Sequence, residues 1–171
     1  MQVEQSKITK LYITKVPNLD PITIYLEDLP PKRGKITIEC YGEAWSYYWG
    51  STGSKSIMDF FVNCDNHYLS EKFDPYIPRT ITNEDELENH AKQHIIQRRK
   101  EDGLSKQEAR YLWNLSCSLE ITDTNTLAEI YGDEWWDCLP KIPNPKTQYL
   151  YRILDACKEG IKLHYSDVEV I

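Results

Sequence analysis

The sequence predicts an α+β fold, in which an N-terminal antiparallel β-meander of three to four strands packs against a C-terminal set of helices. Over the first fifty residues apolar and polar side chains alternate with a period of two, as in strands with one buried face. The gaps between these segments are short, which favours an antiparallel meander. From Ser54 onward apolar residues recur at helical spacing. A chain of 171 residues fits a single domain, strand-rich over residues 1–53 and helix-rich over residues 54–171.

Four segments are the expected strands. Residues 8–16 are rich in β-branched side chains, and residues 22–27 and 35–41 alternate between apolar and polar types. Turns that contain proline or Asn and Asp separate these segments. A fourth strand is expected over residues 44–49, where a glycine follows.

The helices are expected from their capping residues. The first begins after Ser54 or Ser56, either of which can act as its N-cap. Asn83 opens a longer helix, because Glu86 three residues on completes a capping box. Gly103 ends this helix as a C-cap.

Two more helices follow. Ser105 and Glu108 form a second capping box. A final helix begins at residues 144–145, where a cap precedes a proline, and Gly160 ends it. Residues 161–165 are expected to form either a last edge strand or a loose tail.

Negative charge is concentrated in one stretch. The chain has a net charge of −7, and between Tyr111 and Pro140 it has no lysine or arginine. This stretch ends near the adjacent Trp135 and Trp136, which on a helix lie about 100° apart, so that one can be buried while the other faces solvent. Carboxylates beside an exposed indole suit a partner with a basic surface, whereas the alternative is a solvated helical face. The candidate partner-binding residues are Glu120, Asp123, Glu129, Asp133, Glu134, Trp135, Trp136 and Asp137.

The densest aromatic cluster lies in the fourth expected strand. A strand directs alternate side chains to opposite faces, so one set of rings fills the core and the other can stack on a base or on a partner's side chain. A nucleic-acid site also needs a basic groove, which only the turn at residues 32–35 and a few N-terminal lysines could supply, so nucleic-acid binding is the less favoured alternative. The candidate stacking residues are Trp45, Tyr47, Tyr48 and Trp49.

No motif indicates catalysis, a metal or a cofactor. His90 and His94 have the spacing of two metal ligands on a helix, but the metalloprotease glutamate is absent and no third ligand is evident. Cys64 and His67 are close in sequence, which rarely makes a catalytic pair. An enzyme whose site forms only in three dimensions is the second alternative. We therefore expect no catalytic residues, metal or cofactor.

Composition favours a cytosolic protein. No window has the roughly 18 apolar residues of a membrane span, so no membrane association is expected. The N-terminus has no signal-peptide core, and five widely spaced cysteines without a Cys-x-x-Cys pair are typical of a reducing compartment.

The chain resembles a family of hypothetical proteins encoded by lambdoid phages and by prophages of enteric bacteria. The resemblance rests on the segments Leu19–Asp28, Gly34–Trp45, Tyr48–Gly50, Tyr131–Trp136 and Tyr149–Ile153. It implies no catalytic or binding residue. It implies a small accessory protein that binds and modulates or inhibits a host protein, as counter-defence factors do. A more specific form of this hypothesis is partial DNA mimicry.

Overall fold

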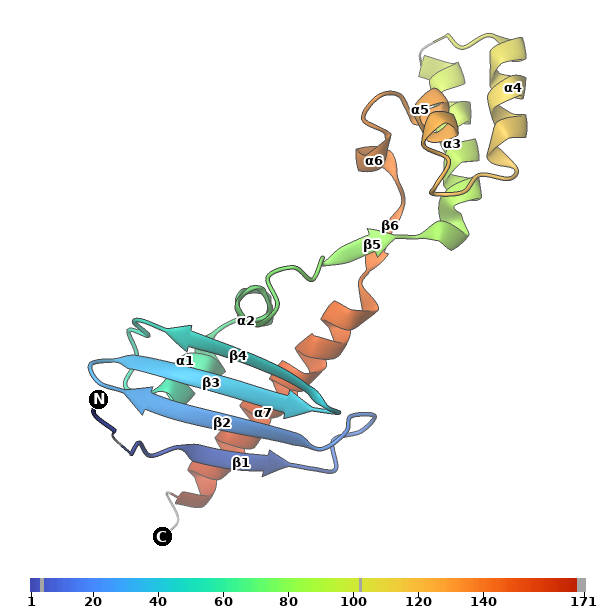
Figure 1. Cartoon of the computed structure of the whole chain (residues 1–171). Helices are drawn as coiled ribbons and strands as arrows, with labels where there is room; N and C mark the ends of the chain where they lie inside the picture. Colours follow the sequence, from blue (N-terminus) through green and yellow to red (C-terminus); the bar gives the residue numbers. More distant parts are fainter. Residues whose placement is uncertain (4, 102, 169–171) are drawn as a thin grey trace. The chain divides into compact units, whose positions relative to one another are not determined.

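The computed structural model describes residues 1–3, 5–101 and 103–168, and the chain forms two compact units (Figure 1). Unit 1 consists of Met1–Pro78 and Pro145–Ile171, and unit 2 of Arg79–Asn144. Each unit has its own cluster of buried hydrophobic side chains. The single domain expected from the sequence stays a prediction.

Unit 1 contains a four-stranded antiparallel sheet in the order β1-β2-β3-β4, which confirms the predicted meander. The strands are β1 (Thr9–Ile13), β2 (Ile22–Leu29), β3 (Arg33–Cys40) and β4 (Glu43–Trp49). The register places Ile24 opposite both Leu11 and Ile38, so that apolar side chains of neighbouring strands share one face. Ile24 and Ile38 are fully buried.

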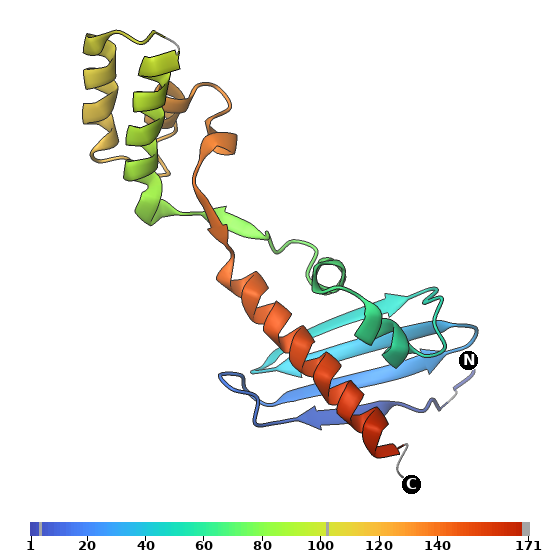
Figure 2. The ribbon, with the colours of Figure 1, turned by 180° about the vertical axis from the view of Figure 1, so that it is seen from behind.

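Three helices cover that face of the sheet, which confirms the α+β class (Figure 2). They are α1 (Ile57–Asn63), α2 (Asn66–Phe73) and α7 (Pro145–Val168). Ser56, one of the two predicted caps, begins α1 by accepting a hydrogen bond from the Asp59 N–H at 3.1 Å. The other face of the sheet carries polar side chains such as Lys10 and Lys35 and is left open.

The last helix corrects the prediction for the C-terminal residues. α7 begins at Pro145 as expected but does not end at Gly160, and the predicted edge strand or loose tail over residues 161–165 is wrong. Ile161 is fully buried in the core of unit 1, so continuing the helix buries apolar surface. A Cβ at Gly160 would lie 2.7 Å from Cδ1 of Ile13, so the glycine serves close packing of α7 on β1.

Unit 2 is a helical unit closed by a short antiparallel ribbon of β5 and β6. Its elements are β5 (Thr80–Thr82), the 3-10 helix η1 (Glu84–Glu86), α3 (Leu87–Glu101), α4 (Lys106–Ser116), α5 (Thr124–Tyr131), α6 (Trp135–Cys138) and β6 (Lys141–Pro143). Side chains of α3, α4 and α5 form the core, among them Ile95, Leu112 and Leu127.

The two predicted capping boxes have different outcomes. Both hydrogen bonds of the Ser105–Glu108 box are present at the start of α4, which confirms it. The box expected at Asn83 and Glu86 is wrong, because the chain forms η1 there and the Asn83 side chain makes no capping bond. Gly103 has a φ of 70°, a conformation that glycine adopts without strain just after α3.

Candidate partner-binding site

The eight candidate partner-binding residues, here called the acidic segment, all lie in unit 2, on and around α5 and α6. Glu120 and Asp123 precede α5, and Glu129 is on it. The other three carboxylates lie at the α5–α6 turn and within α6. All six carboxylate residues are exposed, so each can reach a partner.

The two indoles of the acidic segment have different surroundings. Trp135 is half-buried and packs against the core of unit 2, whereas Trp136 is 51% exposed. Their ring centroids are 5.8 Å apart with an interplanar angle of 76°, an edge-to-face arrangement. Trp135 thus packs against an exposed indole that Glu134 and Asp137 flank closely in the sequence.

Local hydrogen bonds explain why the chain folds this way here. The Asp123 carboxylate accepts a hydrogen bond from the Thr126 N–H at 3.1 Å and so caps α5. Hydrogen bonds from the side chain and the backbone of Thr126 hold the pKa of Asp123 below its usual value. Gly132 has a φ of 94° and ends α5, after which Glu134 precedes α6. Asp123 therefore has a structural role besides its charge.

Two contacts to the acidic segment were not evident from the sequence. The Tyr111 hydroxyl donates to the Glu129 carboxylate at 3.1 Å, and this bond raises the pKa of Tyr111. The Arg98 guanidinium donates to the carbonyls of Ile130 at 2.7 Å and Glu129 at 3.3 Å, at the C-terminal end of α5. One cation therefore lies beside the acidic segment, although the segment itself has none.

The negative surface also extends beyond the acidic segment. Glu84 and Glu120 line one hollow of about 330 Å³, together with Leu87 and Leu119. Unit 2 has thirteen acidic and eight basic residues, a net charge of −5. Only the fold could reveal that Glu84 is near Glu120, because the two are far apart in the sequence.

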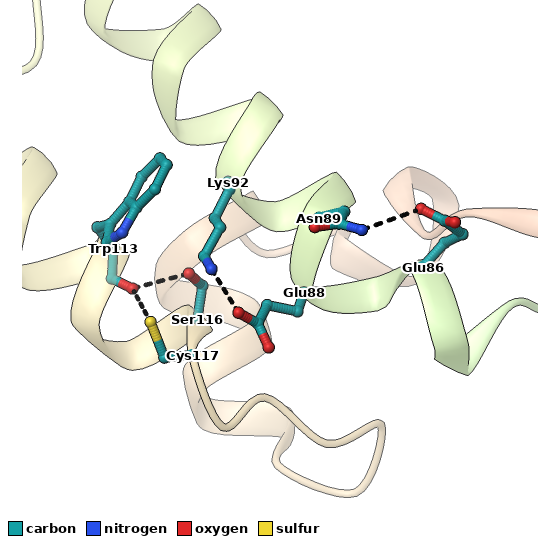
Figure 3. Close-up of polar contacts among 7 residues, drawn as sticks. All are labelled: Glu86, Glu88, Asn89, Lys92, Trp113, Ser116 and Cys117. Atoms are coloured by element: carbon teal, nitrogen blue, oxygen red, sulfur yellow. Dashed lines mark hydrogen bonds and ion pairs between the residues drawn. The ribbon is translucent and has the colours of Figure 1, made fainter.

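Another carboxylate of unit 2 is neutralised within the fold (Figure 3). Glu88 pairs with Lys92 one helical turn on, and the hydrogen bond from this pair raises the pKa of Lys92. The Lys92 ammonium also lies 5.3 Å from the centre of the Trp113 ring, a cation–π contact. The Trp113 carbonyl accepts from the Ser116 hydroxyl at 2.8 Å near the end of α4. Glu88 therefore adds little to the negative surface.

The candidate stacking residues of β4 do not form one platform. Trp49 is 4% exposed, and its indole N–H donates to the Tyr68 hydroxyl at 3.1 Å. Trp45 and Tyr47 lie on the same face as Trp49 and pack against the core under the helices. Tyr48 alone of the four rings faces the open side and is exposed, as strand alternation requires.

The paired histidines of α3 pack on a tyrosine. The Nδ1 atom of His90 lies 3.0 Å from the Tyr131 hydroxyl, and the His94 ring centre lies 4.8 Å from that of Tyr131. Burial raises the pKa of Tyr131 to about 12. Among the residues that the structure describes, no three His, Cys, Asp or Glu side chains converge on a metal position.

No residue that the structure describes hydrogen-bonds to the Cys64 thiol as an activating base would. Burial raises the pKa of this thiol, so it stays protonated at neutral pH. The backbone carbonyl of Cys64 accepts a hydrogen bond from the Lys158 ammonium at 2.6 Å. His67 instead pairs with Glu71 at 3.1 Å. The two residues that are close in sequence thus have separate partners.

Unit 1 contains a hollow of about 580 Å³ whose lining includes Asp20, Glu43 and Asp74. The Tyr149 hydroxyl, also in the lining, lies 3.6 Å from the Cys40 sulfur. This bond to Cys40 raises the pKa of Tyr149 to about 12, so the hydroxyl is neutral near pH 7. It can donate a hydrogen bond there, but it is a poor base.

A family model described as a phage family matches residues 1–163. No curated protein and no solved structure is significantly similar to the chain. Within the part of the chain that the structure describes, no helix is both long and apolar enough to cross a bilayer. The match extends over nearly the whole sequence, and the chain therefore belongs to this phage protein family.

Proposed function

We propose that this phage protein binds a host protein and modulates or inhibits it through the acidic segment. The exposure of Trp136 is the observation that carries the proposal: its indole is 51% exposed and packed edge-on against the half-buried Trp135. An ordered aromatic ring on the surface loses little conformational entropy when a partner covers it, and tryptophan is enriched among residues that dominate binding energy. Asp133, Glu134 and Asp137 are exposed carboxylates within three residues of it along the chain.

The partner that fits this chemistry has a basic surface. Arg or Lys can lie over the Trp136 ring and pair with the neighbouring carboxylates, while the net charge of −5 on unit 2 steers the encounter. A nucleic-acid-binding face of a host defence or repair factor has such a surface. A net charge of −7 on 171 residues is modest for a mimic of a whole DNA duplex, so we favour a local patch with partial DNA mimicry.

The host setting completes the proposal. The chain belongs to a phage family, and its resemblance to proteins of lambdoid phages and enteric prophages suggests action in the cytosol of an enteric bacterium. Small accessory proteins of such phages commonly act by blocking host proteins, and this analogy supports the class of function.

Capture from a host lysate, followed by mass spectrometry, tests the proposal. We expect the tagged wild-type protein to retain a basic host protein at low salt, and Trp136→Ala to lose most of it. Glu159→Lys on α7 is the matched control for Glu134→Lys, because it makes the same charge change at an exposed position of unit 1. The proposal is wrong if capture resists salt and neither Trp136→Ala nor Glu134→Lys weakens it.

A further inference from the structure

A second feature of unit 2 lies between α3 and α4, and no residue of the acidic segment lines it. The two helices pack side by side (Figure 1). They leave a groove of about 280 Å³. Ile95 and Ala109 form part of its wall and are almost fully buried, so the groove has an apolar base. Its remaining residues are Ile96, Arg99, Lys106, Arg110 and Trp113.

The three cations of this groove have no anionic partner within the described part of the chain. Among the residues that the structure describes, none forms a hydrogen bond or ion pair with the side chains of Arg99, Lys106 or Arg110. Two other cations of unit 2 are used within the fold: Arg98 binds the α5 carbonyls and Lys92 pairs with Glu88. Three unpaired cations around one apolar groove can therefore bind an anionic ligand.

We propose that this groove binds a nucleotide, with the phosphates on Arg99, Lys106 and Arg110 and the base against Trp113. Guanidinium groups fit phosphate oxygens with two parallel hydrogen bonds, and the cations come from both helices, so they can hold a phosphate chain from two sides. Trp113 is 38% exposed and offers a flat ring for the base, supported by the cation–π contact of Lys92.

Size and charge favour a single nucleotide over a nucleic-acid strand or an acidic protein segment. The groove volume of about 280 Å³ is slightly below the roughly 300 Å³ at which small-molecule sites start, so the groove suits one small ligand and not a larger one. The net charge of −5 on unit 2 repels a long polyanion, whereas three local cations suffice for one phosphate chain. The apolar base suits the ring of a nucleobase and not a run of carboxylates.

Calorimetric titration of the full-length protein with ATP, AMP and tripolyphosphate tests the proposal. We expect ATP to bind more tightly than AMP, and Arg99→Gln or Arg110→Gln to weaken ATP about tenfold or more. Trp113→Leu should weaken ATP but leave tripolyphosphate unchanged, because only ATP has a base. Arg79→Gln is the matched control, since Arg79 belongs to unit 2 but does not line the groove. Circular dichroism checks that each variant is folded.

Several results would overturn the proposal. One is the absence of ATP binding at millimolar concentration. Another is equal affinity for ATP and tripolyphosphate in the wild-type protein, which would mean that the base makes no contact. A third is preferential binding of a peptide with the sequence of residues 131–139, displacing ATP, which would make the groove a protein interface between copies of this chain.

Discussion

At the scale of single residues, adjacent tryptophans of the same short helix differ in what they contribute. Trp135 packs against the core of unit 2, and Trp136 has half of its surface exposed. Burial of an aromatic ring stabilises the fold, whereas an exposed ring contributes mainly when a partner covers it. We therefore expect Trp135 to contribute mainly to stability and Trp136 mainly to partner binding.

Unfolding in urea measures how much each tryptophan contributes to the free energy of unfolding. We expect Trp135→Ala to lower the free energy of unfolding by about 2 kcal/mol, below the ~3–5 kcal/mol of a fully buried ring, because Trp135 is only half-buried. Trp136→Ala should change it by less than about 0.5 kcal/mol, as expected at a surface position. Equal losses from the two substitutions would contradict the assigned roles.

A second residue-scale prediction concerns pH. Burial raises the pKa of Tyr131 to about 12, above the usual value of 10, so the folded state keeps a proton that the unfolded state releases. The contribution of the protonated Tyr131 to the free energy of unfolding is therefore complete below pH 10. It is lost as the pH rises from about 10 to 12. Urea unfolding of Tyr131→Phe between pH 9 and 11 should show a smaller decline in stability than the wild type. Parallel declines in the two proteins would contradict the prediction.

At the scale of elements, the start of α5 links the fold to the charge of the acidic segment. Asp123 caps this helix through the Thr126 N–H, and its lowered pKa means that the ionised form is the one that caps. Asn caps as well as Asp but carries no charge.

Two substitutions at this cap separate the two roles. We expect Asp123→Ala to lower the free energy of unfolding, because the N-cap is lost, and Asp123→Asn to change it little at pH 7. Asp123→Asn should still weaken partner capture through its lost charge. As the pH falls below about 4, the advantage of Asp123 over Ala should shrink, because protonation removes the charge. An Asn variant as unstable as the Ala variant would contradict this assignment.

A second element, α7, depends on close packing at one glycine. Ala has a higher helix propensity than Gly by about 1 kcal/mol, but a Cβ at Gly160 would lie 2.7 Å from the Ile13 side chain. We expect Gly160→Ala to destabilise the protein by about 1 kcal/mol, because overpacking costs about 1–3 kcal/mol. Ile13→Val should recover part of this loss in the double variant. A stabilising Gly160→Ala would contradict the packing.

The sequence predicted those parts of the fold that short-range patterns determine. Period-two alternation predicted β2 and β3, a run of β-branched residues predicted β1, and the Ser105–Glu108 spacing predicted the start of α4. The sequence prediction was wrong where tertiary packing overrides local preference. Glycine commonly ends a helix, but α7 continues past Gly160 because this buries Ile161. The short α2, α5 and α6 have few residues to display a period, so their bounds could not be predicted.

The candidate site could be predicted only as a set of residues. The lack of lysine and arginine around Trp135 and Trp136 is visible in the sequence, and helix geometry allows one buried and one exposed ring. The contacts of Tyr111 and Arg98 depend on how α3, α4 and α5 pack. Their positions could not be predicted without the fold.

At the scale of the whole molecule, the two units differ in charge. Unit 2 has a net charge of −5, whereas unit 1 has −2 from fourteen acidic and twelve basic residues. Unit 2 also contains both the acidic segment and the basic groove between α3 and α4. We therefore expect recognition to depend on unit 2, with the sheet and helices of unit 1 serving as the scaffold.

The affinity of the captured host protein for the wild type and for Trp136→Ala, measured at about 50 and 300 mM salt, tests the central claim most directly. We predict a loss of roughly thirtyfold from Trp136→Ala, the size of a binding hot spot, and a marked weakening at the higher salt concentration. Equal affinities for the two proteins at both salt concentrations would contradict the claim that this exposed indole and its carboxylates form the binding surface.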